Sequence, residues 1–369
     1  MDSGIDVKLL ELTLSPIRSL LSDPDVTDIL VYGSKDVFYR KRSGAFERKE
    51  NTSWESDEHL TVAVNSIALR MERSLDSRDP ILDARLPDKS RVNIVVDPCY
   101  NKGACIVIRR FPEQHFKLDD LVKFGAIDRN GQKILECIVR TGQNILISGS
   151  TGSGKTTLLN GICGFIPPHD VVVTVEDVRE ISVPCKLWVS LETKRALDSE
   201  DREVTLRDLI HTSLRMNPRW VIVGEVRGKE ALELVRAFNT GHYGAGTIHA
   251  NSAYDALDAL ELLVLQSGLD IPSRAVKGLV SRAIRIVVHM DVLPDHSRVL
   301  SEIIEVEGLA YDREADSHIY KTRTLYQYEF DRFNEKDIAV GRFVVKDPPT
   351  WIDKINQIQN FQTPDFWRS

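Results

Sequence analysis

The stretch "NILISGSTGSGKTTLLN", residues 144–160, determines how the centre of the chain is interpreted. Its apolar start is typical of a strand buried on both faces of a parallel sheet, and its last residues favour a helix. Between them, the pattern G-x-x-x-x-G-K-S/T begins at Gly149 and ends in Lys155 and Thr156. Glycines let backbone N–H groups surround phosphates, Lys155 supplies positive charge, and Thr156 supplies a ligand for Mg²⁺. The predicted phosphate contacts are Gly149, Ser150, Thr151, Gly152, Ser153, Gly154, Lys155, Thr156 and Thr157.

Two further apolar runs, "DVVVTVED" at residues 170–177 and "RWVIVGE" at residues 219–225, also end in polar residues. Helical stretches separate the runs, and this alternation indicates a doubly wound α/β domain with a mostly parallel sheet. Ligands bind at the carboxyl ends of the strands in such a sheet. Glu225 is therefore predicted to order the water shell of Mg²⁺ or to polarise an attacking water. Glu176 ends the other run and is a second candidate carboxylate.

The segment "NTGHYGAGTIHAN", residues 239–251, places two histidines among small residues. Glycines let the backbone come close to a ligand, so His242 and His249 are candidates for contact with a phosphate. The glycine spacing is not that of a dinucleotide fingerprint, and two histidines without a third ligand predict no zinc site. The five cysteines form no C-x-x-C pair, so we expect reduced thiols rather than metal ligands.

Composition and charge narrow the class of protein. A length of 369 residues allows two domains, and 42% hydrophobic with 28% charged residues is typical of a globular chain with a sizeable core. The net charge of -7 disfavours a protein whose main function is to bind nucleic acid, because such proteins carry a basic surface. No apolar run is long enough to span a bilayer, and the first residues do not resemble a secretory signal. We therefore expect a cytoplasmic protein without direct membrane insertion.

The chain is predicted to have four parts. Residues 1–112 form an N-terminal α+β domain, since short β-like runs accompany one apolar helical stripe. Residues 113–128 show no clear period and are predicted to be a linker, and residues 129–310 form the α/β domain. Residues 311–369 are predicted to be a β-like and helical extension. Its stretch "WIDKINQIQNF", residues 351–361, has an apolar helical face that could pack on its own domain or dock a partner.

Four segments, taken together and in order, resemble the type II/type IV secretion-system ATPases over about residues 75–310. In that family they are the Walker A motif, the Asp box, the Walker B motif and the His box. In this chain they are "GSTGSGKTT" (149–157), "TVEDVRE" (174–180), "MNPRWVIVGEVRG" (216–228) and "NTGHYGAGTIHAN" (239–251). The segment "DARLPDKSRVNIVV", residues 83–96, is similar to CpaF-like ATPases of Flp (tight adherence) pili. Conjugation ATPases of the same branch share several of these features.

This resemblance implies a homohexameric ring in which an N-terminal α+β domain precedes a RecA-like P-loop ATPase domain. ATP would bind between the two domains, with Mg²⁺, and its hydrolysis would move an inner-membrane platform protein. The resemblance assigns catalysis to Glu225, Glu176 and Lys155, with Glu225 reaching Mg²⁺ through water. It also assigns further nucleotide contacts to His249, Arg91, Arg109, Arg85 and Arg110. The four-cysteine insert of some relatives is absent, so no zinc is expected.

The predicted function is Mg²⁺-dependent ATP hydrolysis by a motor for a type IV pilus of the Flp/Tad type or a related secretion machine. The motor would lie at the cytoplasmic face of the inner membrane. One alternative is an ATPase of a type IV secretion or conjugation machine. The other is a RecA-like DNA translocase, which the acidic charge balance disfavours. The sequence also lacks an NKxD or LSGGQ-like segment, which disfavours a small GTPase and a transporter ATPase.

Overall fold

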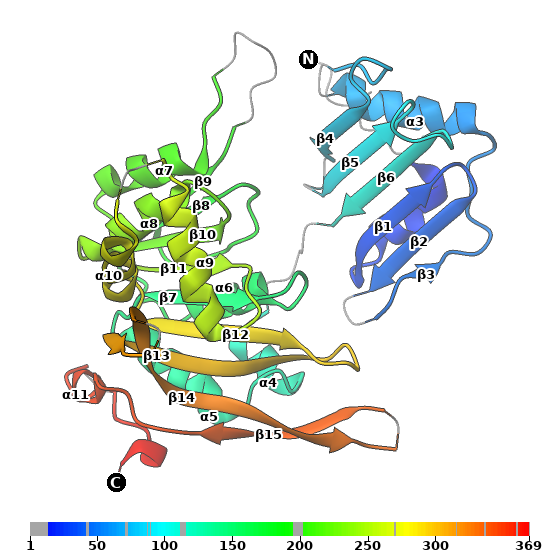
Figure 1. Ribbon diagram of the computed structural model, residues 1–369. Coiled ribbons are helices and arrows are strands. Elements are labelled where there is room, and N and C mark those ends of the chain that lie inside the picture. The colour runs from blue at the N-terminus through cyan, green and yellow to red at the C-terminus, as the bar shows by residue number, and fades with distance from the viewer. Residues whose placement is uncertain are drawn as a thin grey trace. The chain divides into compact units, whose positions relative to one another are not determined.

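The computed structural model describes residues 14–41, 44–70, 73–86, 88, 90–110, 116–194, 202–268, 271–314, 316–335, 337–358 and 361–368. These residues belong to two units, Met1–Gln114 and His115–Ser369 (Figure 1). Each unit has its own sheet and its own hydrophobic core. None of the helices in these ranges is long and apolar enough to cross a membrane.

The first unit is an antiparallel sheet covered by helix α3 (Asp57–Arg70). Its spatial strand order is β3-β2-β1-β6-β5-β4. The strands alternate between buried and more exposed residues, as expected for a sheet with one face on a core. The apolar stripe of α3, which includes Leu60, Val64 and Ile67, is fully buried in that core. The strands are β1 (Val26–Tyr32), β2 (Asp36–Lys41), β3 (Glu47–Arg48), β4 (Ile81–Arg85), β5 (Arg91–Val96) and β6 (Ala104–Arg109), and the short helix α2 (Arg18–Ser22) precedes them.

The second unit contains a nine-stranded sheet in the order β15-β14-β13-β12-β7-β11-β10-β8-β9. Strands β12, β7, β11, β10, β8 and β9 are parallel, whereas β13, β14 and β15 add antiparallel pairs at one side. This arrangement confirms the predicted α/β class with a mostly parallel sheet. The strands are β7 (Ile145–Gly149), β8 (Val171–Glu176), β9 (Leu187–Glu192), β10 (Trp220–Val226), β11 (Tyr243–Ile248), β12 (Ile286–Val292), β13 (Arg298–Asp312), β14 (Ser317–Phe333) and β15 (Ala339–Val345).

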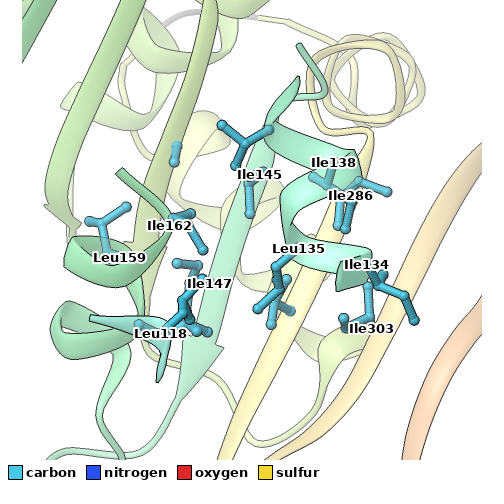
Figure 2. Close-up of a cluster of buried hydrophobic side chains, with 14 of the residues drawn as sticks. Leu118, Ile134, Leu135, Ile138, Ile145, Ile147, Leu159, Ile162, Ile286 and Ile303 are labelled. Carbon is cyan, nitrogen blue, oxygen red and sulfur yellow. The ribbon is translucent and has the colours of Figure 1, made fainter. Parts of the chain in front are cut away.

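Helices cover both faces of this sheet. On one face, α4, α5 and α6 pack on β7, β12 and β13, and Figure 2 shows their side chains meeting around Ile147 and Leu135. On the other face, α7, α8, α9 and α10 bury a second cluster. Both faces of β7 are therefore buried, which explains the consecutive apolar residues Ile145, Leu146 and Ile147. The helices are α4 (Leu118–Lys123), α5 (Arg129–Arg140), α6 (Lys155–Cys163), α7 (Leu206–Ser213), α8 (Glu230–Asn239), α9 (Ala253–Leu265), α10 (Ser273–Ala283) and α11 (Ile352–Ile355).

The structure differs from the predicted organisation in two places. The expected linker contains α4, which buries Leu118 and Leu121 in the core of the second unit. The expected C-terminal extension is part of the large sheet, because β13 runs across residue 310 and β14 and β15 continue from it. Within the stretch 351–361, α11 is only one turn long and buries Ile355 in the core, as the packing interpretation requires.

Candidate nucleotide-binding site

The loop between β7 and α6 has the backbone shape of a phosphate cradle. Strand β7 ends at Gly149, helix α6 begins at Lys155, and Gly149, Gly152 and Gly154 have φ angles of 150°, 77° and 97°. A Cβ atom on Gly149 would lie 2.2 Å from the carbonyl oxygen of Met290. Because that neighbour is backbone of the adjacent strand β12, only glycine fits there.

Lys155 is buried inside this loop, with 7% of its surface exposed. Its Nζ donates to the carbonyl oxygens of Gly149, at 2.9 Å, and Ser150, at 2.8 Å. Burial lowers the pKa of Lys155, because it penalises the charged form. The Ser153 hydroxyl is also buried, and no hydrogen-bond partner for it is found among the described residues. A buried cation held by carbonyl oxygens and a buried hydroxyl without a partner are both suited to an anionic ligand.

Glu225 and His249 reach the same edge from the two neighbouring strands. The Glu225 Oε1 atom lies 2.6 Å from His249 Nε2, and His249 Nδ1 lies 3.4 Å from Lys155 Nζ. The second carboxylate oxygen of Glu225 accepts a hydrogen bond from Arg227. Strands β7, β11 and β10 are parallel neighbours, so their carboxyl ends bring these residues together. Three motifs that lie far apart in the sequence are thus joined by direct contacts.

Glu176 ends β8, the next strand beyond β10, and is almost completely buried. Its Oε1 accepts hydrogen bonds from the backbone N–H groups of Glu180, at 2.8 Å, and Ile181, at 2.9 Å. Its Oε2 is buried, with no partner in the part of the chain that the structure describes. Burial raises the pKa of Glu176 to about 7, although both N–H donors act to lower it. A carboxyl group that titrates near neutral pH suits proton transfer.

Three of the predicted arginines form a row in the first unit. Arg85 pairs with Arg91 across β4 and β5, and Arg91 pairs with Arg109 across β5 and β6. Directly opposed residues in antiparallel strands point to the same face, where like charges repel. Arg91 lies 3.5 Å from Asp83, and Arg109 lies 3.4 Å from an oxygen of Asp28. The carboxylates of Asp83 and Asp28 therefore neutralise part of the positive charge on this face of the sheet.

Comparison with known proteins identifies the group to which this chain is related. A family model described as "Type II/IV secretion system protein" matches residues 11–323. The chain belongs to this family.

Individual relatives agree with the family match. An uncharacterized protein of Methanocaldococcus jannaschii is 30% identical over 332 residues, which are 89% of this chain and 57% of that protein. The chain thus spans little more than half of that relative's length. The type IV secretion system protein PtlH homolog of Bordetella bronchiseptica is 32% identical over 301 residues, 74% of this chain and 88% of that protein. The crystal structure of the pilus retraction motor PilT with bound ADP is similar in fold, with a TM-score of 0.56 and 20% identity over 79% of this chain and 81% of that one.

The structure corrects the sequence prediction for two residues of this secretion-family chain. His242 precedes β11, at the opposite end of the strand from His249, and a strand of this length separates them by about 20 Å. The ring of His242 lies 3.2 Å from the carbonyl oxygen of Ala237 instead. Arg110 donates to the carbonyl oxygen of Asp23, at 2.7 Å, and so anchors the segment that follows α2. It does not join the row of Arg85, Arg91 and Arg109.

The residues at this edge fit Mg²⁺ by their chemistry. Thr156, the second residue of α6, offers a hydroxyl, and Glu225 offers a carboxylate whose side chain is 20% exposed. Mg²⁺ prefers such oxygen ligands, keeps several waters, and takes phosphate oxygens of a substrate as its remaining ligands.

Two residues near the site were not predicted from the sequence. Arg227 could have been found, because residues two apart in a strand-like run lie on the same side, and Arg227 comes two residues after Glu225. Arg298, whose Nε donates to the Gly152 carbonyl oxygen at 2.7 Å, gave no local signal.

Proposed function

We propose that this chain is a Mg²⁺-dependent ATPase that works as a motor for a pilus or secretion machine. The observation that carries the proposal is the line of contacts from Lys155 through His249 to Glu225, which joins the phosphate loop to the two following motifs. The PilT structure contains ADP, and that protein has a similar fold. A nucleotide phosphate is therefore the ligand that the loop suits best.

Each residue would have a separate task in hydrolysis. Phosphate oxygens would replace the carbonyl oxygens of Gly149 and Ser150 as partners of Lys155 Nζ. Thr156 would hold Mg²⁺ directly and Glu225 would reach it through a water; when bound, Mg²⁺ neutralises charge on the phosphates. Glu225, released from His249, would orient the attacking water and accept its proton. Glu176 would hold a proton at this edge near neutral pH.

The row of Arg85, Arg91 and Arg109 would supply a second set of phosphate contacts from the N-terminal unit. We propose that contacts from these arginines to ATP phosphates would draw the two units together, and that loss of phosphate would release them. We further propose that six copies form a ring, since the resemblance described above implies a homohexamer. The ring would act at the cytoplasmic face of the inner membrane on a platform protein embedded there.

For the machine itself, we propose a type IV pilus of the Flp/Tad type. The CpaF-like segment at residues 83–96, which contains two arginines of the row, favours this reading. The alternative is a type IV secretion or conjugation machine, which the likeness to the PtlH homolog favours. Affinity capture of Glu225→Gln protein from detergent-solubilised membranes separates them. A polytopic pilus platform protein would support the pilus, and conjugation-channel components would support the alternative.

Phosphate release by the purified chain tests the enzymatic proposal. We expect turnover that requires Mg²⁺ and is abolished by Lys155→Ala, because neutral alanine cannot hold the phosphates. Lys229→Ala is the matched control, since Lys229 is exposed at the N-cap of α8 and its side chain makes no capping hydrogen bond to that helix. Normal turnover in Lys155→Ala would contradict the proposal. A salt-sensitive rise in turnover on adding DNA would favour a DNA translocase instead.

A further inference from the structure

The turn between β12 and β13, residues 293–297, lies between the phosphate loop and the C-terminal hairpin of β14 and β15. Arg298 follows this turn, and its Nε donates to the carbonyl oxygen of Gly152 at 2.7 Å. The side chain also covers Gly154, because its Cδ would lie 3.7 Å from a Cβ at that position. Arg298 therefore contacts the middle and the end of the loop, while Met290 of β12 abuts its start.

The turn itself is held by a compact set of internal hydrogen bonds. The backbone N–H of Leu293 donates to the carbonyl oxygen of Ser297 at 2.9 Å, and that of His296 donates to Leu293 at 2.8 Å. The Oδ1 atom of Asp295 accepts from the N–H of Ser297, at 3.0 Å, and from its hydroxyl, at 2.6 Å. The bond from Asp295 to the N–H two residues later forms an Asx-turn, which stabilises this turn conformation.

The other oxygen of Asp295 reaches the hairpin. Its Oδ2 accepts a hydrogen bond of 2.7 Å from the backbone N–H of Ala339, the first residue of β15. Ala339 pairs with Phe333 at the end of β14, so the contact is made at the tip of the hairpin. Figure 1 shows the ends of β12 and β13 beside the far end of β14 and β15. Asp295 in this turn therefore bonds to the hairpin tip, and Arg298, which follows the turn, bonds to the phosphate loop.

The hairpin tip carries exposed apolar side chains. Phe330, Phe333 and Ile338 are 48%, 42% and 50% exposed, and the two phenylalanine rings lie 5.0 Å apart. Farther along the hairpin, the ring of Phe343 lies 5.0 Å from that of Tyr328 and 5.6 Å from that of Tyr326, which is fully buried. The family match ends at residue 323, before these residues. The tip is therefore an exposed apolar surface that lies outside the part of the chain matched by the family model.

We propose that Arg298 is a positioning residue of the phosphate loop and that its turn transmits the state of the loop to the hairpin tip. This rests on the proposed function, because the loop must bind a nucleotide. In the present state Lys155 is bonded to the loop carbonyls of Gly149 and Ser150. Phosphate would take those bonds and settle the loop, including Gly152. Hydrogen bonds join Gly152 to Arg298 and Asp295 to Ala339, and the backbone of residues 295–298, with Asp295 bonded to Ser297, connects the two contacts.

Hydrogen exchange of the full-length chain tests the link at the amide of Ala339. We expect Mg²⁺ with a slowly hydrolysed ATP analogue to slow exchange in residues 338–345 about fivefold, the lower end of typical coupling between sites. Asp295→Ala removes the acceptor for Ala339 and should abolish the change without altering nucleotide affinity more than about twofold. Asp295→Asn keeps an acceptor oxygen and should restore it. Asp291→Ala is the control, since in the described part of the chain the Asp291 side chain accepts a hydrogen bond only from the neighbouring Val292 N–H.

A second variant tests the role of Arg298 separately. Arg298→Gln should weaken nucleotide binding and also remove the change at Ala339, whereas Arg342→Gln, which breaks an ion pair within the hairpin, should leave both intact. A merely structural arginine would not move exchange at Ala339. If nucleotide binds wild-type protein but exchange in the hairpin stays the same, or if Asp295→Ala responds like wild type, this inference is overturned while the ATPase proposal stands. Absence of nucleotide binding to wild type would overturn both.

Discussion

Glu176 allows a sharp prediction about pH, because its side chain is buried and its pKa is raised to about 7. The variant Glu176→Gln keeps an oxygen that can accept from the N–H groups of Glu180 and Ile181, but it cannot ionise. The comparison of Glu176→Gln with wild type therefore isolates the cost of the buried negative charge. Glutamine has nearly the same size and shape as glutamate, so the packing around residue 176 changes little.

The magnitude follows from the two pKa values. Below pH 4.5 the carboxyl is protonated in both the folded and the unfolded chain, so it does not affect the free energy of unfolding. Between pH 4.5 and about 7 the unfolded chain loses its proton first, and wild type becomes less stable as the pH rises. At about 1.4 kcal/mol for each pH unit, the loss reaches about 3 kcal/mol above pH 7. Glu176→Gln does not suffer this loss.

Equilibrium urea unfolding, followed by circular dichroism from pH 4.5 to pH 8, measures the difference. We expect the stability of Glu176→Gln relative to wild type to increase by about 3 kcal/mol across this range. Asp177→Asn is the control, since the neighbouring Asp177 carboxylate is exposed instead of buried. If the curves for wild type and Glu176→Gln run parallel with pH, then Glu176 is not a carboxyl group that ionises near neutral pH.

Three other substitutions have expected outcomes. Gly149→Ala places a Cβ 2.2 Å from a backbone oxygen of β12, so it should lower the free energy of unfolding by about 2–4 kcal/mol in urea titrations and weaken nucleotide binding. Glu305→Ala removes the fully buried partner of Arg285 and Thr350 and should lower the free energy of unfolding by about 2–3 kcal/mol in the same assay. Unchanged stability would mean that the contacts of Glu305 do not stabilise the C-terminal segment. Arg91→Ala should raise the KM for ATP at least tenfold in a phosphate-release assay, and an unchanged KM would remove the arginine row from the site.

Much of the site could be predicted because each of its parts is defined by a short run of consecutive residues. The apolar run of β7, the three glycines and the start of α6 define the loop within one short segment. The meeting of Glu225 and His249 with that loop follows from one further fact, that the strands are parallel neighbours. Parallel strands present all their carboxyl ends at one edge.

The errors have equally physical causes. His242 shares a motif with His249, but His242 precedes β11 and His249 follows it. The motif alone does not show at which end of the strand each residue lies. Helix α4 has six residues and only two buried ones, too few to give a visible period. The contact of Arg298 with Gly152 joins residues 146 positions apart, and no local pattern encodes it.

The C-terminal hairpin was predicted to be β-like but was separated from the ATPase domain, because the family resemblance ended near residue 310. Its strands alternate an aromatic face with a charged face on which Glu329 pairs with Arg342 and Lys346. Such alternation predicts a strand but does not say which sheet it joins. Only the register with β13 shows that the hairpin extends the large sheet.

The most direct test of the central claim separates binding from hydrolysis in Glu225→Gln. If Lys155, His249 and Glu225 form one catalytic site, this variant should bind ATP with nearly wild-type affinity in equilibrium titrations. In single-turnover assays with radiolabelled ATP, its rate of phosphate release should fall by about a hundredfold or more, since glutamine cannot accept a proton. A rate of phosphate release equal to that of wild type would contradict the account.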